Sequence, residues 1–118
     1  MRVLSGEQVL VRVFIGASDR WHHQSLDTAL LERLRAEHFA GATVFHGVAG
    51  FGARSVLHTT HLLRLSEDLP VVIEIVDTEE HVEKLLPILD EMVSEGLVTA
   101  ERVRVIKYAP GTRPPDPA

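Results

Sequence analysis

The feature that most limits how this chain can fold is a stretch in its middle, where two strand-like runs flank a long insertion. The runs are Thr43–Ala49 and Pro70–Val76. Hairpin loops usually have about two to five residues, but about 20 residues separate these runs. Loops as long as this one usually bind a ligand or partner, or gate a site. The sequence therefore predicts a small scaffold that carries a functional loop, Gly50–Ser66.

The first part of the chain predicts one strand and one helix. Val and Ile alternate with other residues through Gln8–Ile15, which is the periodicity of a strand. After the polar loop Gly16–Gln24, Ser25 is placed to cap a helix whose apolar residues repeat at helical spacing to about Phe39. Gly41 fits the end of that helix.

The last part of the chain predicts a second helix and a fourth strand. Thr78 is placed to cap the helix, Pro87 should kink it, and Gly96 should end it. A strand follows over about Arg102–Tyr108. The order strand, helix, strand, strand, helix, strand predicts an α+β, ferredoxin-like fold.

Length and composition predict one soluble domain. A chain of 118 residues makes one domain, which we place at residues 8–108, between an N-terminal extension (1–7) and a disordered Pro-rich tail (109–118). The net charge of −5 argues against nucleic acid as a partner. No apolar run is long enough for membrane insertion, and no leader pattern is present, so the expected location is cytoplasmic. The absence of cysteine excludes disulfides, thiolate metal sites and a Cys nucleophile.

The predicted sheet has apolar residues on both faces, although the helices of a ferredoxin-like fold cover only one. If the face with Val9, Val11 and Val13 meets the helices, a second apolar set lies on the outer face: Leu10, Phe14, Val72 and Val76. Arg12 and Glu74 fall on that outer face and are expected to pair, the alternative being two solvated charges. An exposed apolar face predicts oligomerisation.

Several ordered motifs resemble the PII-like family known as domain of unknown function 190. They are Gly41-Ala42-Thr43-Val44, Gly47, Gly50-Phe51-Gly52, His58, Leu65–Asp77, Gly96–Thr99 and Val103–Tyr108. The resemblance covers about residues 8–108. It implies a trimer related to the PII signalling proteins, which bind adenine nucleotides between subunits and contact target proteins through a long loop. In this chain that loop corresponds to Gly50–Ser66.

One segment departs from the PII pattern. The resemblance places the phosphate-binding B-loop at Ser94–Thr99, which here holds one glycine, Glu95 and no Lys or Arg. A triphosphate needs several amide and cationic donors, so these residues favour a smaller anion. The cations available elsewhere are Arg54, Arg64, Arg102, Arg104 and Lys107.

The predicted ligand site combines glycine amides with cationic side chains. Its residues are Gly47, Gly50, Phe51, Gly52, Arg54, Arg102 and Arg104, a set that suits phosphate or carboxylate groups. The second and fourth strands of a ferredoxin-like sheet are opposite edges, so a site that uses both needs two subunits. Phe51 has the alternative role of packing as a turn anchor.

Other kinds of site are less well supported by the sequence. His58 and His61 are three residues apart and could share a metal in a helix, but simple solvated histidines are favoured. No nucleophile elbow or paired acid pattern is present, so no enzyme, catalytic residue or cofactor is expected. Trp21 is expected to pack. The predicted function is a trimeric PII-like regulator that binds an adenine nucleotide or small anion; the alternatives are a partner-binding trimer without a ligand and a CutA-like metal-responsive protein.

Overall fold

The computed structural model describes residues 3–52 and 68–111, which contain two helices and six strands. Their order is β1 (Gly6–Gly16), β2 (Arg20–Trp21), β3 (Gln24–Ser25), α1 (Leu26–Ala36), β4 (Thr43–His46), β5 (Pro70–Asp77), α2 (Glu79–Met92) and β6 (Leu97–Val105). Residues 53–67, which hold most of the predicted functional loop, lie outside the described residues, as does most of the predicted tail.

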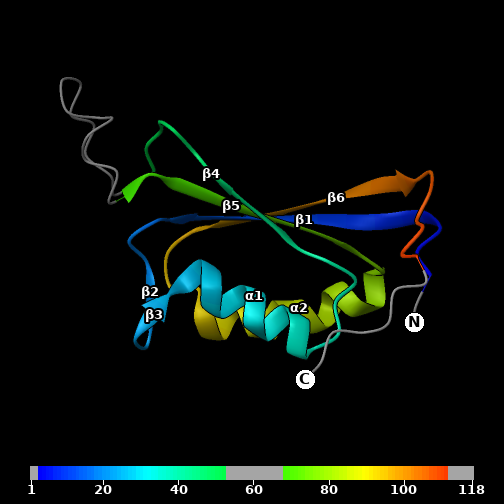
Figure 1. Ribbon diagram of the computed structural model, residues 1–118, viewed down its shortest axis with the longest axis horizontal. Helices are drawn as coiled ribbons and strands as arrows, with labels where there is room; N and C mark the ends of the chain where they lie inside the picture. Colours follow the sequence, from blue (N-terminus) through cyan, green and yellow to red (C-terminus); the bar gives the residue numbers. More distant parts are fainter. Residues whose placement is uncertain (1–2, 53–67, 112–118) are drawn as a thin grey trace.

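The main sheet is antiparallel and has the strand order β4-β5-β1-β6. Both helices lie on one side of it and leave the other side open (Figure 1). This is the predicted α+β, ferredoxin-like arrangement, with β4 and β6 as the two edge strands. β2 and β3 form a separate two-stranded hairpin at one end of the helix layer.

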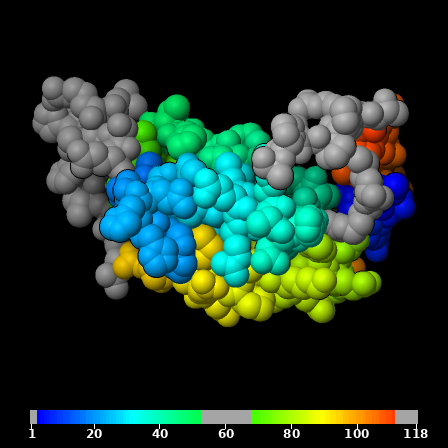
Figure 2. Space-filling model, turned by 60° about the horizontal axis from the view of Figure 1, so that its bottom comes forward, coloured from blue at the N-terminus to red at the C-terminus, as the bar shows by residue number. Residues whose placement is uncertain are grey.

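The core lies between the sheet and the helices because the inward-facing strand residues are β-branched and apolar. Val13 on β1 and Val71 and Ile73 on β5 have no exposed surface. Leu30 of α1 and Leu85 of α2 meet them from the helix side and are equally buried. Figure 2 shows the helix side of the molecule, where α1 and α2 lie next to each other. Burying each such side chain contributes about 1.5–3 kcal/mol to folding.

The two helices begin at the predicted residues, but only one uses the predicted cap. The Thr78 hydroxyl accepts a hydrogen bond from the backbone N–H of His81 at 3.1 Å, as expected. Ser25 stands at the cap position of α1, yet its side chain makes no capping bond to the backbone. Its hydroxyl instead donates to the Thr28 hydroxyl at 2.9 Å, and the Asp27 carboxylate accepts from the Thr28 N–H.

The end of α1 differs from the prediction, which assigned it to Gly41. The helix ends at Ala36, and His38 takes the left-handed conformation that glycine usually supplies, with φ of 64°. The His38 N–H donates to the Arg35 carbonyl and the Phe39 N–H to the Leu34 carbonyl, each at 3.1 Å. This is the Schellman pattern, completed by the burial of the Phe39 side chain. The left-handed position at the end of this helix therefore does not require glycine, because packing of the following residue, Phe39, stabilises the turn.

The boundary between α2 and β6 was also predicted wrongly. α2 contains Pro87, as expected, but it ends at Met92 rather than near Gly96. β6 begins at Leu97, about five residues before the predicted start, because it pairs with β1 along its whole length from Phe14 onward. Gly96 lies in the tight turn before it: a Cβ there would stand 2.7 Å from the Phe14 carbonyl oxygen. The second half of the segment assigned to the B-loop, Leu97–Thr99, is thus strand.

Three smaller differences concern strand lengths and the hairpin. β4 ends at His46, whereas the predicted strand ran to Ala49, and β1 begins at Gly6. The hairpin of β2 and β3 was predicted as a plain loop. Trp21, within it, is partly buried against the core, in agreement with the expected packing role.

Neither helix in the described part of the chain is long and apolar enough to cross a membrane.

Candidate functional site

A cavity in the described part of the chain lies where three strands of the main sheet end or begin. The antiparallel register places Gly16 opposite Pro70 and Phe14 opposite Leu97, so the end of β1 and the starts of β5 and β6 meet there. The cavity has a volume of about 510 Å³, and Phe51 and Gly52 are among the residues that line it. We call it the strand-end cavity. Its size is that of a small-molecule site.

One part of the cavity lining is apolar and includes two aromatic rings. Phe14 and Leu97 project from neighbouring positions on β1 and β6, and Ile15 and Pro70 lie beside them. Phe51 is 70% exposed and Leu97 is 57% exposed. Exposed apolar side chains around a hollow suit a flat apolar group that covers them on binding.

The polar part of the lining is acidic. It consists of the carboxylates of Asp19, Asp68 and Glu95, and no Lys, Arg or His stands among the described residues that line the cavity. Asp19 Oδ2 accepts the Gly16 N–H at 3.0 Å, and Asp68 Oδ1 accepts the Ser18 hydroxyl at 3.0 Å. Both carboxylates lie close to Gly16. A Cβ at that position would stand 2.2 Å from Asp68 Oδ1 and 3.5 Å from Asp19 Oδ1.

The predicted glycines lie close to this cavity. A Cβ at Gly47 or at Gly50 would stand 2.8 Å from Pro70 Cγ, so both glycines allow the chain after β4 to pack on the start of β5. The Gly47 N–H donates to the Pro70 carbonyl at 2.7 Å. Phe51 and Gly52 follow directly and line the cavity. The structure thus brings four of the predicted site residues to one place.

The predicted arginines are not brought to that place within one chain. Arg102 and Arg104 pair with Val9 and Glu7, near the far end of β6 from Leu97. At about 3.3 Å per residue, they stand roughly 15–25 Å along the strand from the cavity. The guanidinium of Arg102 lies 3.8 Å from Glu79, and both side chains are exposed. Arg54 lies outside the described residues.

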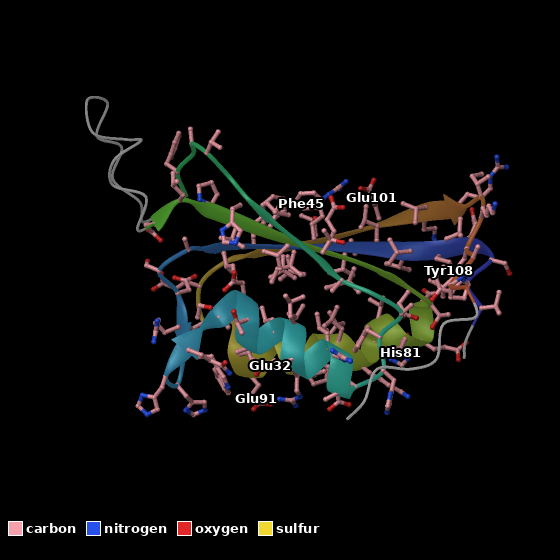
Figure 3. The ribbon with its side chains drawn as sticks, in the orientation of Figure 1. Glu32, Phe45, His81, Glu91, Glu101 and Tyr108 are labelled. Atoms are coloured by element: carbon pink, nitrogen blue, oxygen red, sulfur yellow. The ribbon has the colours of Figure 1, made fainter. Side chains whose placement is uncertain are left out.

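The outer face of the sheet carries the predicted ion pair and the predicted apolar side chains. Arg12 Nε lies 3.0 Å from Glu74 on β5, and Arg12 Nη1 lies 2.5 Å from Glu101 on β6. Hydrogen bonds to Glu74 and then Glu101 raise the pKa of Arg12 above its usual value. Figure 3 shows Glu101 and Phe45 on this face, opposite the helices with Glu32 and Glu91. The intrachain pair is therefore confirmed.

The apolar part of the outer face is incompletely covered. Leu10 is 9% exposed, and Phe14, Val72 and Val76 are partly buried. Phe45 remains 50% exposed beside them on β4. The described part of the chain offers nothing to cover this face.

The described histidines form no metal site. No group of three or more potential ligands comes together among residues 3–52 and 68–111. His46 Nε2 lies 3.5 Å from Asp27, and His81 Nε2 lies 3.0 Å from the Glu37 carbonyl oxygen, so each has a neighbour on α1 or at its end. His58 and His61, which carried the metal hypothesis, lie outside the described residues.

The sequence reasoning missed the three carboxylates of the cavity. Asp19 was placed only in the polar loop Gly16–Gln24, Asp68 only in the family motif Leu65–Asp77, and Glu95 was noted only as a departure from a phosphate-binding pattern. The predicted strand order could have indicated them. In this fold β1 lies between β5 and β6 and is antiparallel to both, so the residues after β1, before β5 and before β6 come together at one end of the sheet.

The chain matches one protein-family model and is similar to several individual proteins. The DUF190 family, described as an uncharacterized ACR, matches residues 8–105. A UPF0166 protein of Methanocaldococcus jannaschii is 32% identical over 99 residues, covering 83% of this chain and 91% of that protein. A UPF0166 protein of Aquifex aeolicus is 35% identical over 108 residues, covering 90% and 98%.

Solved structures show the same fold at low sequence identity. CPII from Thiomonas intermedia K12, bound to ADP, AMP and acetate, superposes with a TM-score of 0.63 at 14% identity, covering 89% of this chain and 94% of CPII. CPII has also been solved with ADP and bicarbonate. A putative PII-like signaling protein from Thermus thermophilus gives 0.61 at 19% identity, covering 87% and 94%. The chain therefore belongs to the DUF190 family and has the PII-like fold.

Proposed function

We propose that this protein is a non-enzymatic PII-like regulator that binds an adenine nucleotide or a small anionic metabolite and signals through the connection between β4 and β5. The observation that carries the proposal is the strand-end cavity, which Phe51 and Gly52 border at the start of that connection. A ligand in the cavity contacts the base of the connection directly. Its presence can therefore change the conformation that a target protein meets.

The choice of ligand class rests on the relatives and on the charges of the chain. CPII, with the same fold, was solved with ADP, AMP, acetate and bicarbonate. Arg102 and Arg104 supply exposed cations on the edge strand β6 of this chain. Charged donors of this kind bind phosphate and carboxylate groups.

We further propose that the functional unit is a homotrimer with the ligand at a subunit boundary. Within one chain the cavity and the two arginines lie at different ends of β6, so a site that uses both needs a second copy. The partly covered outer face, with Phe14, Val72 and Phe45, supplies an apolar surface for assembly. Exposed patches of this type mark interaction surfaces.

The experiment that tests the function is a thermal-shift panel on the full chain with AMP, ADP, ATP, acetate, bicarbonate and divalent metals. A ligand that binds only the folded state raises the melting temperature by mass action, by an amount equivalent to about 2.7 kcal/mol at a hundredfold excess over Kd. We expect a shift with at least one adenine nucleotide. A shift with metals alone supports the CutA-like alternative, and no shift at all contradicts the proposed ligand class and favours a partner-binding trimer.

A further inference from the structure

We propose that assembly of this protein through the outer face of its sheet takes up about one proton per copy, so that a lower pH strengthens the assembly. This inference rests on the proposed function, because a second copy is the occupant of the outer face. It adds a control of assembly by pH. The observations that carry it are the balance of charges on that face and the exposure of the charged side chains.

The outer face carries one positive and two negative side chains. Strand alternation and the register of the sheet place Arg12 of β1, Glu74 of β5 and Glu101 of β6 on this face, where Figure 3 shows Glu101. The other outer positions of the four described strands hold apolar residues and three uncharged polar ones, Gln8, Thr43 and Thr99. With both carboxylates ionised, each copy therefore presents an excess of negative charge on an otherwise uncharged face.

A single guanidinium serves both carboxylates. Arg12 Nε lies 3.0 Å from Glu74 Oε2, and Arg12 Nη1 lies 2.5 Å from Glu101 Oε1. Within residues 3–52 and 68–111, no second cationic side chain forms an ion pair with either carboxylate. The side chains of Arg12, Glu74 and Glu101 are 37%, 34% and 55% exposed, so water stabilises the excess charge in the single chain.

A second copy on this face removes that water without changing the balance of charge. The mixed signs allow Arg12 of one copy to lie beside a carboxylate of the next. Every copy nevertheless brings the same three charged side chains, so the contact holds excess negative charge whatever its symmetry. Desolvation disfavours an ionised carboxylate, and so does a second carboxylate nearby.

A proton on either carboxylate restores the balance. If Glu74 or Glu101 is protonated, the other carboxylate stays paired with Arg12 and the set is neutral. The assembled form then binds more protons than the separated copies do. By linkage, the state that binds more protons gains stability as the pH falls, so acid favours assembly and alkali opposes it.

Analytical ultracentrifugation of the full chain between about pH 5 and pH 8, at constant ionic strength, tests the inference; histidines titrate in the same range. We expect the association constant of the wild type to rise as the pH falls, by up to about tenfold per pH unit for each proton taken up. Glu101→Gln keeps an oxygen for Arg12 and removes the excess charge. It should assemble more tightly than the wild type at the alkaline end and depend less on pH. Both proteins have the same histidines, so the difference between their slopes reports the carboxylates.

Two further variants separate charge balance from a structural role. Arg12→Gln leaves both carboxylates without their cation, so it should weaken assembly most at the alkaline end and steepen the pH dependence. Glu83→Gln removes the same charge from the exposed side of α2 and should match the wild type at every pH. A purely structural role would instead make Arg12→Gln and Glu101→Gln both weaken the assembly.

Equal pH dependence in the wild type and Glu101→Gln, or weaker assembly of Glu101→Gln at the alkaline end, would overturn the inference while the proposed assembly stands. A protein that stays single over the whole pH range contradicts the proposed assembly and this inference with it. Circular dichroism checks folding, and Glu74→Gln carries the test if Glu101→Gln does not fold. If dilution does not dissociate the wild-type assembly, the pH dependence of its urea midpoint gives the same comparison, because unfolding then includes dissociation.

Discussion

The two faces of the sheet differ in how completely the chain itself covers them. On the helix side, Val13, Val71 and Ile73 have no exposed surface, and two helices cover them. On the outer side, the same strands present Phe14 and Val72, which are only partly covered. The inner face is fully buried within the chain. The outer face is a partly exposed apolar surface that also carries the Arg12–Glu74 ion pair.

This difference indicates which properties belong to one chain and which need a second copy. The inner face fixes the fold, and it does so with residues that the strand periodicity identifies. The outer face and the two ends of β6 hold the features on which the proposed function rests. A chain that leaves apolar strand residues open, and places its arginines far from its cavity, is suited to a site completed by assembly.

The largest expected effect comes from a charge on the outer face. Phe14→Asp should dissociate the assembly or unfold it, because an unpaired carboxylate buried in an apolar contact is costly. Light scattering at micromolar concentration measures the mass. The control is Ile106→Asp, which adds the same charge at a residue that is 78% exposed beyond β6 and should change nothing. An assembly that survives Phe14→Asp unchanged would show that this face is not the contact.

Arg104 tests whether the far end of β6 belongs to the ligand site. Arg104→Ala should weaken binding of ADP by about 1.5–3 kcal/mol, the range for hydrogen bonds to charged groups, without dissociating the assembly. Calorimetry gives the affinity. Lys84→Ala on α2 is the matched control for loss of a positive charge. Equal affinities for wild type and Arg104→Ala would remove this residue from the site.

Two neighbouring valines on β5 compare the faces directly. Val71→Ala, on the inner face, should lower the free energy of unfolding by about 1.5 kcal/mol at any protein concentration, since two methyl groups leave a finished core. Val72→Ala, on the outer face, should have a cost that depends on protein concentration, because the contact it loses lies between copies. Urea denaturation at several concentrations separates the two. The same concentration dependence for both variants would contradict the comparison.

The smallest expected effect concerns two arginines that each face two carboxylates. Arg33 on α1 pairs with Glu37 and Glu91, and its side chain is 34% exposed, close to the 37% of Arg12. Arg33→Gln should lower the free energy of unfolding by less than about 1 kcal/mol, as surface pairs do. Arg12→Gln should be more harmful, because assembly buries the carboxylates it leaves behind. If thermal denaturation shows the same loss of unfolding free energy for both variants, the carboxylates around Arg12 are as exposed to solvent as those around Arg33. Assembly would then not bury the outer face.

The sequence predicted the strands and helices well where the spacing of apolar residues and the helix-capping residues indicate the same element. The alternation in β1 and β5 identified both faces, and Thr78 identified the start of α2. The failures lie where tertiary contacts decide. His38 adopts a positive φ because burial of Phe39 holds the turn, and β6 begins at Leu97 because β1 offers it a partner there. Neither cause is visible in a local window of sequence.

The candidate site was only partly predictable for a similar reason. The glycines and Phe51 stood out as a motif, and the structure places them together beside Pro70. The carboxylates of Asp19, Asp68 and Glu95 come from three separate loops, and only the strand order unites them. Arg102 and Arg104 were grouped with the glycines by charge alone, and whether a second copy brings them to the cavity stays a prediction.

Native mass spectrometry of the full chain with and without ADP tests most directly the claim that the site is completed by assembly. The account predicts a species of three times the chain mass of 13.1 kDa, with ADP bound to that species and not to single chains. ADP bound to a 13.1 kDa species, or a protein that stays single at micromolar concentration, would contradict it.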